Sequence, residues 1–233
     1  MSDAAILPPK GSPLGLGSAS REAGAFWACV FHPPAFPREV PRGDGHTVLV
    51  IPGFLAGDWT TARMRNFLRT IGYRTHTARV AFNAGPTPGM LARLDETLLA
   101  LSRSGRISLV GQSLGGILAR SLAARHTGHV RGVVTLGSPI RFPVTTPLQP
   151  FAQMLTPFQD KAWLGDLGHV AAPPGVPVTA IYSEEDGIVD WRQCLQDEDA
   201  MCRNVRVSGA HATMGSNPEA QAAMARALSA LCG

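Results

Sequence analysis

The sequence predicts an α/β fold in which a mainly parallel sheet of about six strands is flanked by helices. Strand-like and helix-like segments alternate along most of the chain, and this alternation is typical of parallel sheets. A length of 233 residues with 45% hydrophobic content is enough to bury one sizeable core. The chain has no internal repeat, so we expect one domain over residues 26–233.

Short apolar runs predict the strands, and apolar residues at helical spacing predict the helices. The expected strands lie near residues 47–52, 74–81, 106–111, 130–136, 177–183 and 203–208. The expected helices lie near residues 59–70, 88–103, 114–126 and 217–231. Residues suited to helix starts are Asp58, Pro88 and the pair Asn217-Pro218.

Two segments fall outside this alternation. Residues 1–25 are rich in Ala, Gly, Pro and Ser and lack periodicity, so we expect a flexible N-terminal segment there. Residues 140–175 form an insertion between two expected core strands, and prolines divide it into short pieces. Loop residues 83–87 favour a turn without a catalytic role.

Residues 111–116, with the sequence Gly-Gln-Ser-Leu-Gly-Gly, join an expected strand to an expected helix. A serine at a sharp strand-to-helix turn projects its hydroxyl from the sheet, and the positions two residues before and after it must be small. Gly111 and Gly115 satisfy this requirement around Ser113. The sequence therefore predicts a nucleophile at Ser113.

An acidic residue and a histidine follow the serine at the ends of later strands. Asp186 lies in the loop after the strand near residues 177–183, and we select it as the acid, although Asp-Gly is also a common turn pair. Its acidic neighbours remain alternatives: Glu184, Glu185 and Asp190. Among the seven histidines, only His211 follows both Ser113 and Asp186 at the end of a strand. This order of nucleophile, acid and base predicts a Ser113, Asp186, His211 triad.

At these residues the chain resembles the α/β-hydrolase family, and in particular its compact lipase- and esterase-like members. The stretches that carry the resemblance are Val50-Ile51-Pro52-Gly53-Phe54, residues 111–116, Thr135-Leu136-Gly137-Ser138-Pro139, residues 183–189 and Ser208-Gly209-Ala210-His211. The resemblance implies hydrolysis of a carboxylic ester through an acyl-enzyme, with neither metal nor organic cofactor. It also assigns the oxyanion hole to the backbone N–H groups of Phe54 and Leu114. Many members have His-Gly where this chain has Pro52-Gly53, but the backbone N–H that the turn must supply is retained.

The resemblance also implies that residues 140–175 form a cap over the site. Apolar side chains of this segment, among them Phe151, Met154 and Leu155, are expected to bind a hydrophobic acyl group. The alternative is that they only cover the sheet. The same triad also serves thioesterases, acyltransferases and amidases, and a hydrolase-fold protein without catalysis is a further alternative.

Composition limits the other classes of function. The net charge is +4, but the arginines are scattered, so we expect no nucleic-acid partner. The four cysteines show no metal-ligand spacing, and we expect free thiols, although Cys194 and Cys202 are close enough in sequence to bridge. The chain has neither a secretory signal nor a membrane-spanning run, which predicts a cytoplasmic protein and leaves peripheral membrane contact open. Its oligomeric state is not indicated.

Overall fold

A computed structural model describes residues 39–232 together with Gly17, Ser20, Glu22, Gly24, Phe36 and Pro37. The flexible segment expected over residues 1–25 and Cys29 therefore lie largely outside the described residues. Among the residues that are described, no helix has both the length and the apolar character needed to cross a membrane.

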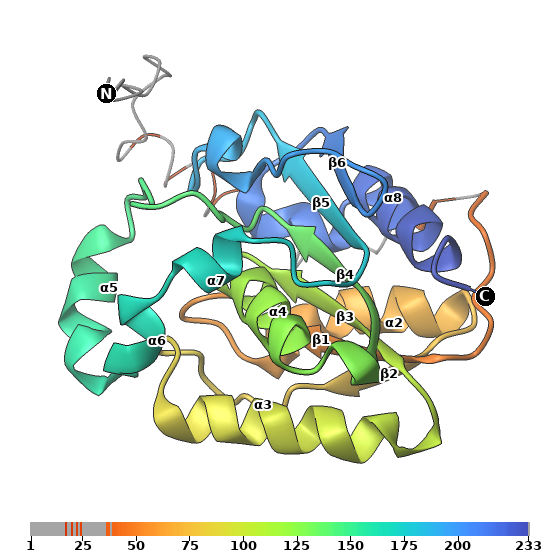
Figure 1. The fold of residues 1–233 in the computed structure, drawn as a ribbon. Helices are drawn as coiled ribbons and strands as arrows, with labels where there is room; N and C mark the ends of the chain where they lie inside the picture. The colour runs from red at the N-terminus through yellow and green to blue at the C-terminus, as the bar shows by residue number, and fades with distance from the viewer. Residues whose placement is uncertain are drawn as a thin grey trace, which may run out of the picture.

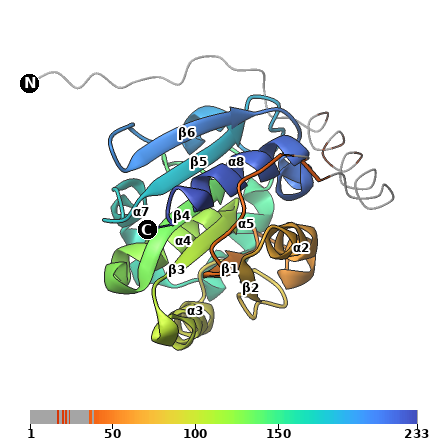
Figure 2. The same cartoon turned by 90° about the vertical axis from the view of Figure 1, so that its right-hand side faces the viewer.

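The centre of the molecule is a sheet of six strands that all run parallel, which confirms the predicted fold class (Figure 1). Its strands are β1 Thr47–Ile51, β2 Arg74–Thr77, β3 Ile107–Gln112, β4 Val130–Leu136, β5 Val178–Ser183 and β6 Cys202–Val207. They lie in the order β2-β1-β3-β4-β5-β6, and Figure 2 shows them succeeding one another across the molecule. The register pairs Ile51 with Gly111 and Gln112 with Leu136, so the carboxyl ends of the central strands lie side by side. The loops that follow β1, β3, β4, β5 and β6 therefore open at one edge of the sheet.

Helices cover both faces of the sheet. The buried side chains of α3 (Pro88–Leu101) and α4 (Leu114–Arg125) share one core cluster with Leu49 and Leu109 of the sheet. Those of α2 (Ala62–Thr70) and α8 (Pro218–Ser229) share a second cluster on the opposite face. Buried apolar residues on both faces are expected for parallel strands between two helical layers.

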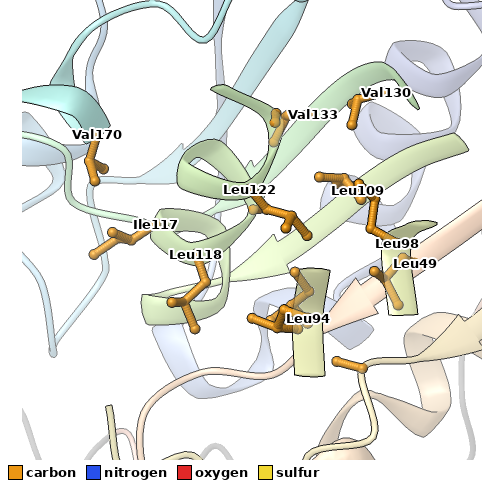
Figure 3. Close-up of a cluster of buried hydrophobic side chains, with 14 of the residues drawn as sticks. Leu49, Leu94, Leu98, Leu109, Ile117, Leu118, Leu122, Val130, Val133 and Val170 are labelled. Atoms are coloured by element: carbon orange, nitrogen blue, oxygen red, sulfur yellow. The ribbon is translucent and has the colours of Figure 1, made fainter. Parts of the chain in front are cut away.

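Helix α4 lies in the middle of the first layer, and its leucines pack onto the central strands (Figure 3). Leu122 and Leu118 are at most 1% exposed and belong to the same cluster as Leu94 of α3 and Leu109 of β3. Complete burial of one leucine side chain contributes roughly 1.5–3 kcal/mol. This packing fixes the helix that begins directly after Ser113.

The expected starts of α3 and α8 are confirmed. Pro88 is the first residue of α3, and the hydroxyl of Thr87 accepts a hydrogen bond from the Met90 N–H at 3.2 Å. Asn217 caps α8, because its side-chain oxygen accepts from the Glu219 N–H at 2.8 Å. These contacts satisfy N–H groups that have no partner within the helix.

The second strand ends earlier than the sequence predicts, at Thr77 rather than near residue 81. The carboxylate of Asp58 accepts hydrogen bonds from the N–H groups of Ala78 and Val80, at 3.1 and 2.9 Å, and Arg79 between them has a positive φ of 59°. A side chain from a distant turn therefore takes the donors that a continued strand would use. Asp58 itself begins a 3-10 turn over Asp58–Thr61 that leads into α2.

The segment over residues 140–175 contains three short helices, which are α5 (Gln149–Leu155), α6 (Lys161–Gly165) and α7 (Gly168–Ala171). In Figure 1, α5 and α6 lie at the left of the molecule. Several hydrogen bonds tie the segment to α4. The buried guanidinium of Arg120 donates to the carbonyl of Val170 at 2.8 Å, and the indole N–H of Trp163 donates to the Ser121 hydroxyl at 3.0 Å.

Candidate active site

Ser113 lies at a sharp turn between β3 and α4, with φ of 54° and ψ of −126°. Such a conformation costs a non-glycine residue on the order of 1–3 kcal/mol, and the surrounding packing must hold it. A Cβ on Gly111 would lie 2.2 Å from the carbonyl oxygen of Gly115, and a Cβ on Gly115 would lie 2.2 Å from that of Ile51. The two glycines thus allow the strand and the helix to meet closely enough to form the turn.

Asp186 and His211 form a hydrogen bond of 2.6 Å between Oδ2 and Nδ1. Asp186 follows β5, and its other oxygen accepts from the N–H groups of Ile188 and Val189 at 2.9 and 2.8 Å. A Cβ on Gly137, in the loop after β4, would come within 3.0 Å of both His211 Nδ1 and Asp186 Oδ2. The absence of a side chain at Gly137 therefore leaves the space in which the pair meets.

The acidic alternatives to Asp186 have other partners. Glu184 pairs with Arg206 at 3.3 Å, and Glu185 accepts from the Gly209 N–H at 2.9 Å. Asp190 accepts from the Arg192 N–H at 3.0 Å. Of these carboxylates, only that of Asp186 is bonded to the imidazole in the described part of the chain.

The loop of His211 is tied to the turn that carries Ser113. Gln112, directly before Ser113, donates from its side-chain amide to the His211 carbonyl at 2.8 Å. Within the described residues the Ser113 hydroxyl and His211 do not form a hydrogen bond. Contacts between a nucleophile and its base are often long without substrate, so this geometry is compatible with a catalytic pair.

Two opposing effects act on the imidazole. Burial lowers the pKa of His211 because it disfavours the cation, whereas the charge and hydrogen bond of Asp186 raise it, with a smaller contribution from the charge of Glu22. The net result is a pKa of His211 above the ordinary value of 6.5. The pair is thus suited to stabilising an imidazolium that forms during a reaction.

Phe54 and Leu114, the expected donors to an oxyanion, line the same cavity as Ser113. A Cβ on the adjacent Gly53 would lie 3.2 Å from Cβ of Ser113, so the loop after β1 passes close to the nucleophile. Leu114 begins α4, and N–H groups of a first helical turn have no partner within their helix. Such groups are available to a developing negative charge.

The cavity beside Ser113 has a volume of about 180 Å³ and a mainly apolar lining. Its walls come from the loops after β1, β4 and β5, from α4 and from the segment over residues 140–175. The apolar residues of the lining include Phe54, Ile117, Phe142, Leu148, Ala152, Trp163, Leu164, Leu167 and Val189. The expected acyl-binding residues Phe151, Met154 and Leu155 do not line it. Phe151 and Met154 are 50% and 64% exposed, because α5 turns the side with Gln149 and Ala152 to the cavity instead.

A family model described as the alpha/beta hydrolase fold matches residues 46–169, which is more than half of the chain. This chain belongs to the α/β-hydrolase fold family. No curated protein sequence matches it.

Solved structures with this fold are similar at low sequence identity. A lipase-esterase related protein from Clostridium acetobutylicum matches with a TM-score of 0.56 and 14% identity over 82% of this chain and 97% of that one. A monoglyceride lipase from Saccharomyces cerevisiae matches with a TM-score of 0.56 and 16% identity over 83% and 89%. The thioesterase domain from the curacin biosynthetic pathway has values of 0.54 and 16% over 82% and 92%. These likenesses concern the fold alone.

Two supporting residues of this α/β hydrolase were missed in the sequence. Asn83, which is fully buried, donates to the Pro52 carbonyl at 2.9 Å, and its backbone bonds to Leu55 and Ala56, so it holds the loop that carries Phe54. Glu22, which is distant in sequence, accepts hydrogen bonds from the backbone of the loops that carry Asp186 and His211. An asparagine before a turn glycine gives a signal only for the turn, and the segment around Glu22 gives none.

One group of metal-ligand types occurs among the described residues, formed by Asp44, His46 and Cys232. Asp44 and His46 directly precede β1, so the group lies at the opposite edge of the sheet from Ser113. Both ring nitrogens of His46 are already engaged, one with Asp44 and one with Ser108, and Asp44 also pairs with Arg131 at 2.9 Å. These contacts do not fit a metal centre.

Proposed function

We propose that the protein is a serine hydrolase that cleaves carboxylic esters, with Ser113 as nucleophile, His211 as base and Asp186 as the residue that orients His211. The observation that carries this proposal is the Asp186–His211 hydrogen bond of 2.6 Å beside a strained serine turn on the wall of an apolar cavity. Membership of the α/β-hydrolase family supports it.

In the proposed reaction, His211 Nε2 accepts the proton of the Ser113 hydroxyl as its oxygen attacks the ester carbonyl. The backbone N–H groups of Phe54 and Leu114 stabilise the negative charge that develops on the carbonyl oxygen. His211 then donates its proton to the departing alcohol and leaves an acyl group on Ser113. A water molecule, deprotonated by His211, attacks this acyl-enzyme, and the carboxylic acid leaves as the serine recovers its proton.

Asp186 holds Nδ1–H of the imidazole, which leaves Nε2 free to accept a proton. The two N–H groups that bind its other oxygen keep the carboxylate in place. No step in this sequence calls for a metal or organic cofactor.

The cavity supports an acyl group of moderate length as the substrate. An apolar cavity of ~150 Å³ accommodates a benzene molecule. A volume of about 180 Å³ therefore suits an acyl chain of roughly six carbon atoms, whereas a palmitoyl chain would extend beyond it.

The test is the initial rate of hydrolysis of p-nitrophenyl esters from acetyl to palmitoyl by the wild type and by Ser113→Ala. We expect a maximum of kcat/KM near hexanoyl and loss of turnover in the variant, with an unchanged melting temperature. Full activity of Ser113→Ala contradicts the proposal.

A phosphonate probe that reacts with active serines, used beside the ester assay, distinguishes the alternatives. Labelling of Ser113 by a phosphonate probe without ester turnover indicates a selective thioesterase, amidase or acyltransferase. The absence of both turnover and labelling indicates a binding protein. The cytoplasmic location, the cap role of residues 140–175 and contact with a membrane surface stay predictions of the sequence.

A further inference from the structure

Glu22 brings a buried carboxylate to the two loops that carry Asp186 and His211. The residue is only 4% exposed. Its Oε1 accepts hydrogen bonds from the N–H groups of Gly187 at 2.7 Å and His211 at 2.9 Å, and its Oε2 accepts from that of Ala212 at 2.8 Å. One side chain therefore joins the loop after β5 to the loop after β6.

The hydrogen bonds of the Glu22 carboxylate stabilise this connection between the two loops. Burial of a carboxylate is costly unless hydrogen bonds replace its water, and N–H bonds to a charged acceptor are stronger than bonds between neutral groups. Gly187 directly follows Asp186, and the other two donors are His211 and its neighbour. Glu22 thus holds the backbones on either side of the Asp186–His211 hydrogen bond.

We propose that Glu22 is a positioning residue that locks the loop of Asp186 to the loop of His211 and thereby orients the imidazole toward Ser113. The proposal rests on the proposed hydrolase function. Glu22 acts through other groups, because its three hydrogen bonds within the described part of the chain all go to backbone N–H groups. Its negative charge also lies close enough to His211 to favour the imidazolium.

Glu185 provides a matched control. Its Oε2 accepts from the Gly209 N–H at 2.9 Å, so it joins the same two loops, but its side chain is exposed and its partner lies two residues before His211. An exposed contact of this kind contributes little. Glu185→Gln therefore removes a carboxylate charge from the same pair of loops without altering a contact to the backbone of His211.

The test uses the full-length variants Glu22→Gln, Glu22→Ala and Glu22→Asp, with p-nitrophenyl hexanoate as substrate over a range of pH. We expect kcat of the Gln and Ala variants to fall by about 10²-fold, because a small misplacement of a catalytic group costs this much. KM should change little. The acid limb of the kcat/KM profile should move to lower pH in both, because the negative charge of Glu22 that favours the imidazolium is lost, whereas that of Asp186 is retained.

Glu22→Asp keeps the charge and should therefore keep the position of the limb and recover part of kcat. Glu185→Gln should remain within about twofold of the wild type. The proposal would be overturned if Glu22→Gln and Glu22→Ala kept the wild-type kcat and the wild-type position of the acid limb of the kcat/KM profile. An equal loss of kcat in all three Glu22 variants with an unmoved limb would also overturn it, because that pattern indicates a merely structural role.

A second set of measurements tests the positioning role of Glu22 independently of turnover. In Glu22→Ala, the NMR titration of the His211 ring should move to lower pH, and hydrogen exchange of the Gly187 and Ala212 amides should accelerate by about tenfold or more. If the wild type shows no Ser113-dependent hydrolysis, the proposed function fails, and these two readouts still test Glu22. Unchanged titration and exchange would refute its role.

Discussion

Asp186→Asn is expected to abolish most of the activity by changing which nitrogen of His211 carries the proton. The present carboxylate binds Ile188 and Val189 with one oxygen and His211 Nδ1 with the other. An asparagine amide has one oxygen and one NH₂ group, so it cannot accept hydrogen bonds on both sides.

The structure determines which way this amide would turn. With its oxygen toward Ile188 and Val189, it keeps two hydrogen bonds. The opposite orientation leaves two N–H groups without an acceptor, at about 1–3 kcal/mol each. The first orientation is therefore favoured, and it places NH₂ against His211 Nδ1. The imidazole then accepts at Nδ1 and carries its proton on Nε2, so it cannot take the proton of Ser113.

The expected decrease of kcat in Asp186→Asn follows from the loss of His211 as a base. An equivalent change in a Ser-His-Asp enzyme lowers kcat by about 10⁴-fold, which corresponds to about 5.5 kcal/mol of transition-state stabilisation. The assay is kcat on p-nitrophenyl hexanoate, together with the melting temperature as a control for folding. We expect a loss of about 10³–10⁴-fold with the fold retained.

Asp190→Asn is the matched control, because Asp190 lies in the same loop region and accepts from the Arg192 N–H at 3.0 Å without contacting His211. It should keep nearly all of the activity. The reasoning is refuted if Asp186→Asn stays within about tenfold of the wild type. It is equally refuted if Asp190→Asn is as inactive as Asp186→Asn, because Asp186 would then not be the triad acid.

Three further predictions concern pH, packing and the loop after β1. Because the pKa of His211 is raised above 6.5, kcat/KM should reach half its maximum above pH 6.5. The stability that protonation of His211 gives should be present below pH 6.5 and lost as pH rises through the folded-state pKa. A midpoint below pH 6.5, either in the rate profile or in urea unfolding at several pH values, would contradict this prediction. Gly115→Ala should lower the free energy of unfolding by roughly 3 kcal/mol, because its Cβ would lie 2.2 Å from the Ile51 carbonyl oxygen, whereas Gly89→Ala, which meets nothing within 4 Å, should be neutral or slightly stabilising in the same denaturation assay. Asn83→Ala should lower kcat by up to about 10²-fold with little change in KM, because the loop with Phe54 loses its bond at the Pro52 carbonyl, and an unaltered kcat would exclude this role.

The elements of the fold were predictable because they depend on local patterns. Helix α4 and strand β3 follow from the periodicity of nearby apolar residues, and the turn at Ser113 follows from glycines two positions away on either side. The order of the candidate triad along the chain was sufficient to select Asp186 and His211, which the structure places 2.6 Å apart. The catalytic roles of these residues stay predictions.

Features that depend on distant segments were not predictable. Strand β2 ends at Thr77 because the Asp58 carboxylate takes the N–H groups that follow, and no local signal marks that contact. The side of α5 that faces the cavity carries Gln149 and Ala152 rather than Phe151 and Met154, and only the docking of the short helices fixes that choice.

The sequence by itself therefore determined the parallel α/β fold, the serine turn and the order of the catalytic candidates, because each depends on neighbouring residues and on backbone preferences. The tertiary structure alone decided the shape of the cavity, the support of the loop after β1 by Asn83 and the placement of Glu22. A hydrogen bond such as that between Glu22 and His211 joins residues 189 positions apart. Contacts at this separation form only when the whole sheet is assembled, and no periodicity or composition of a single segment encodes them.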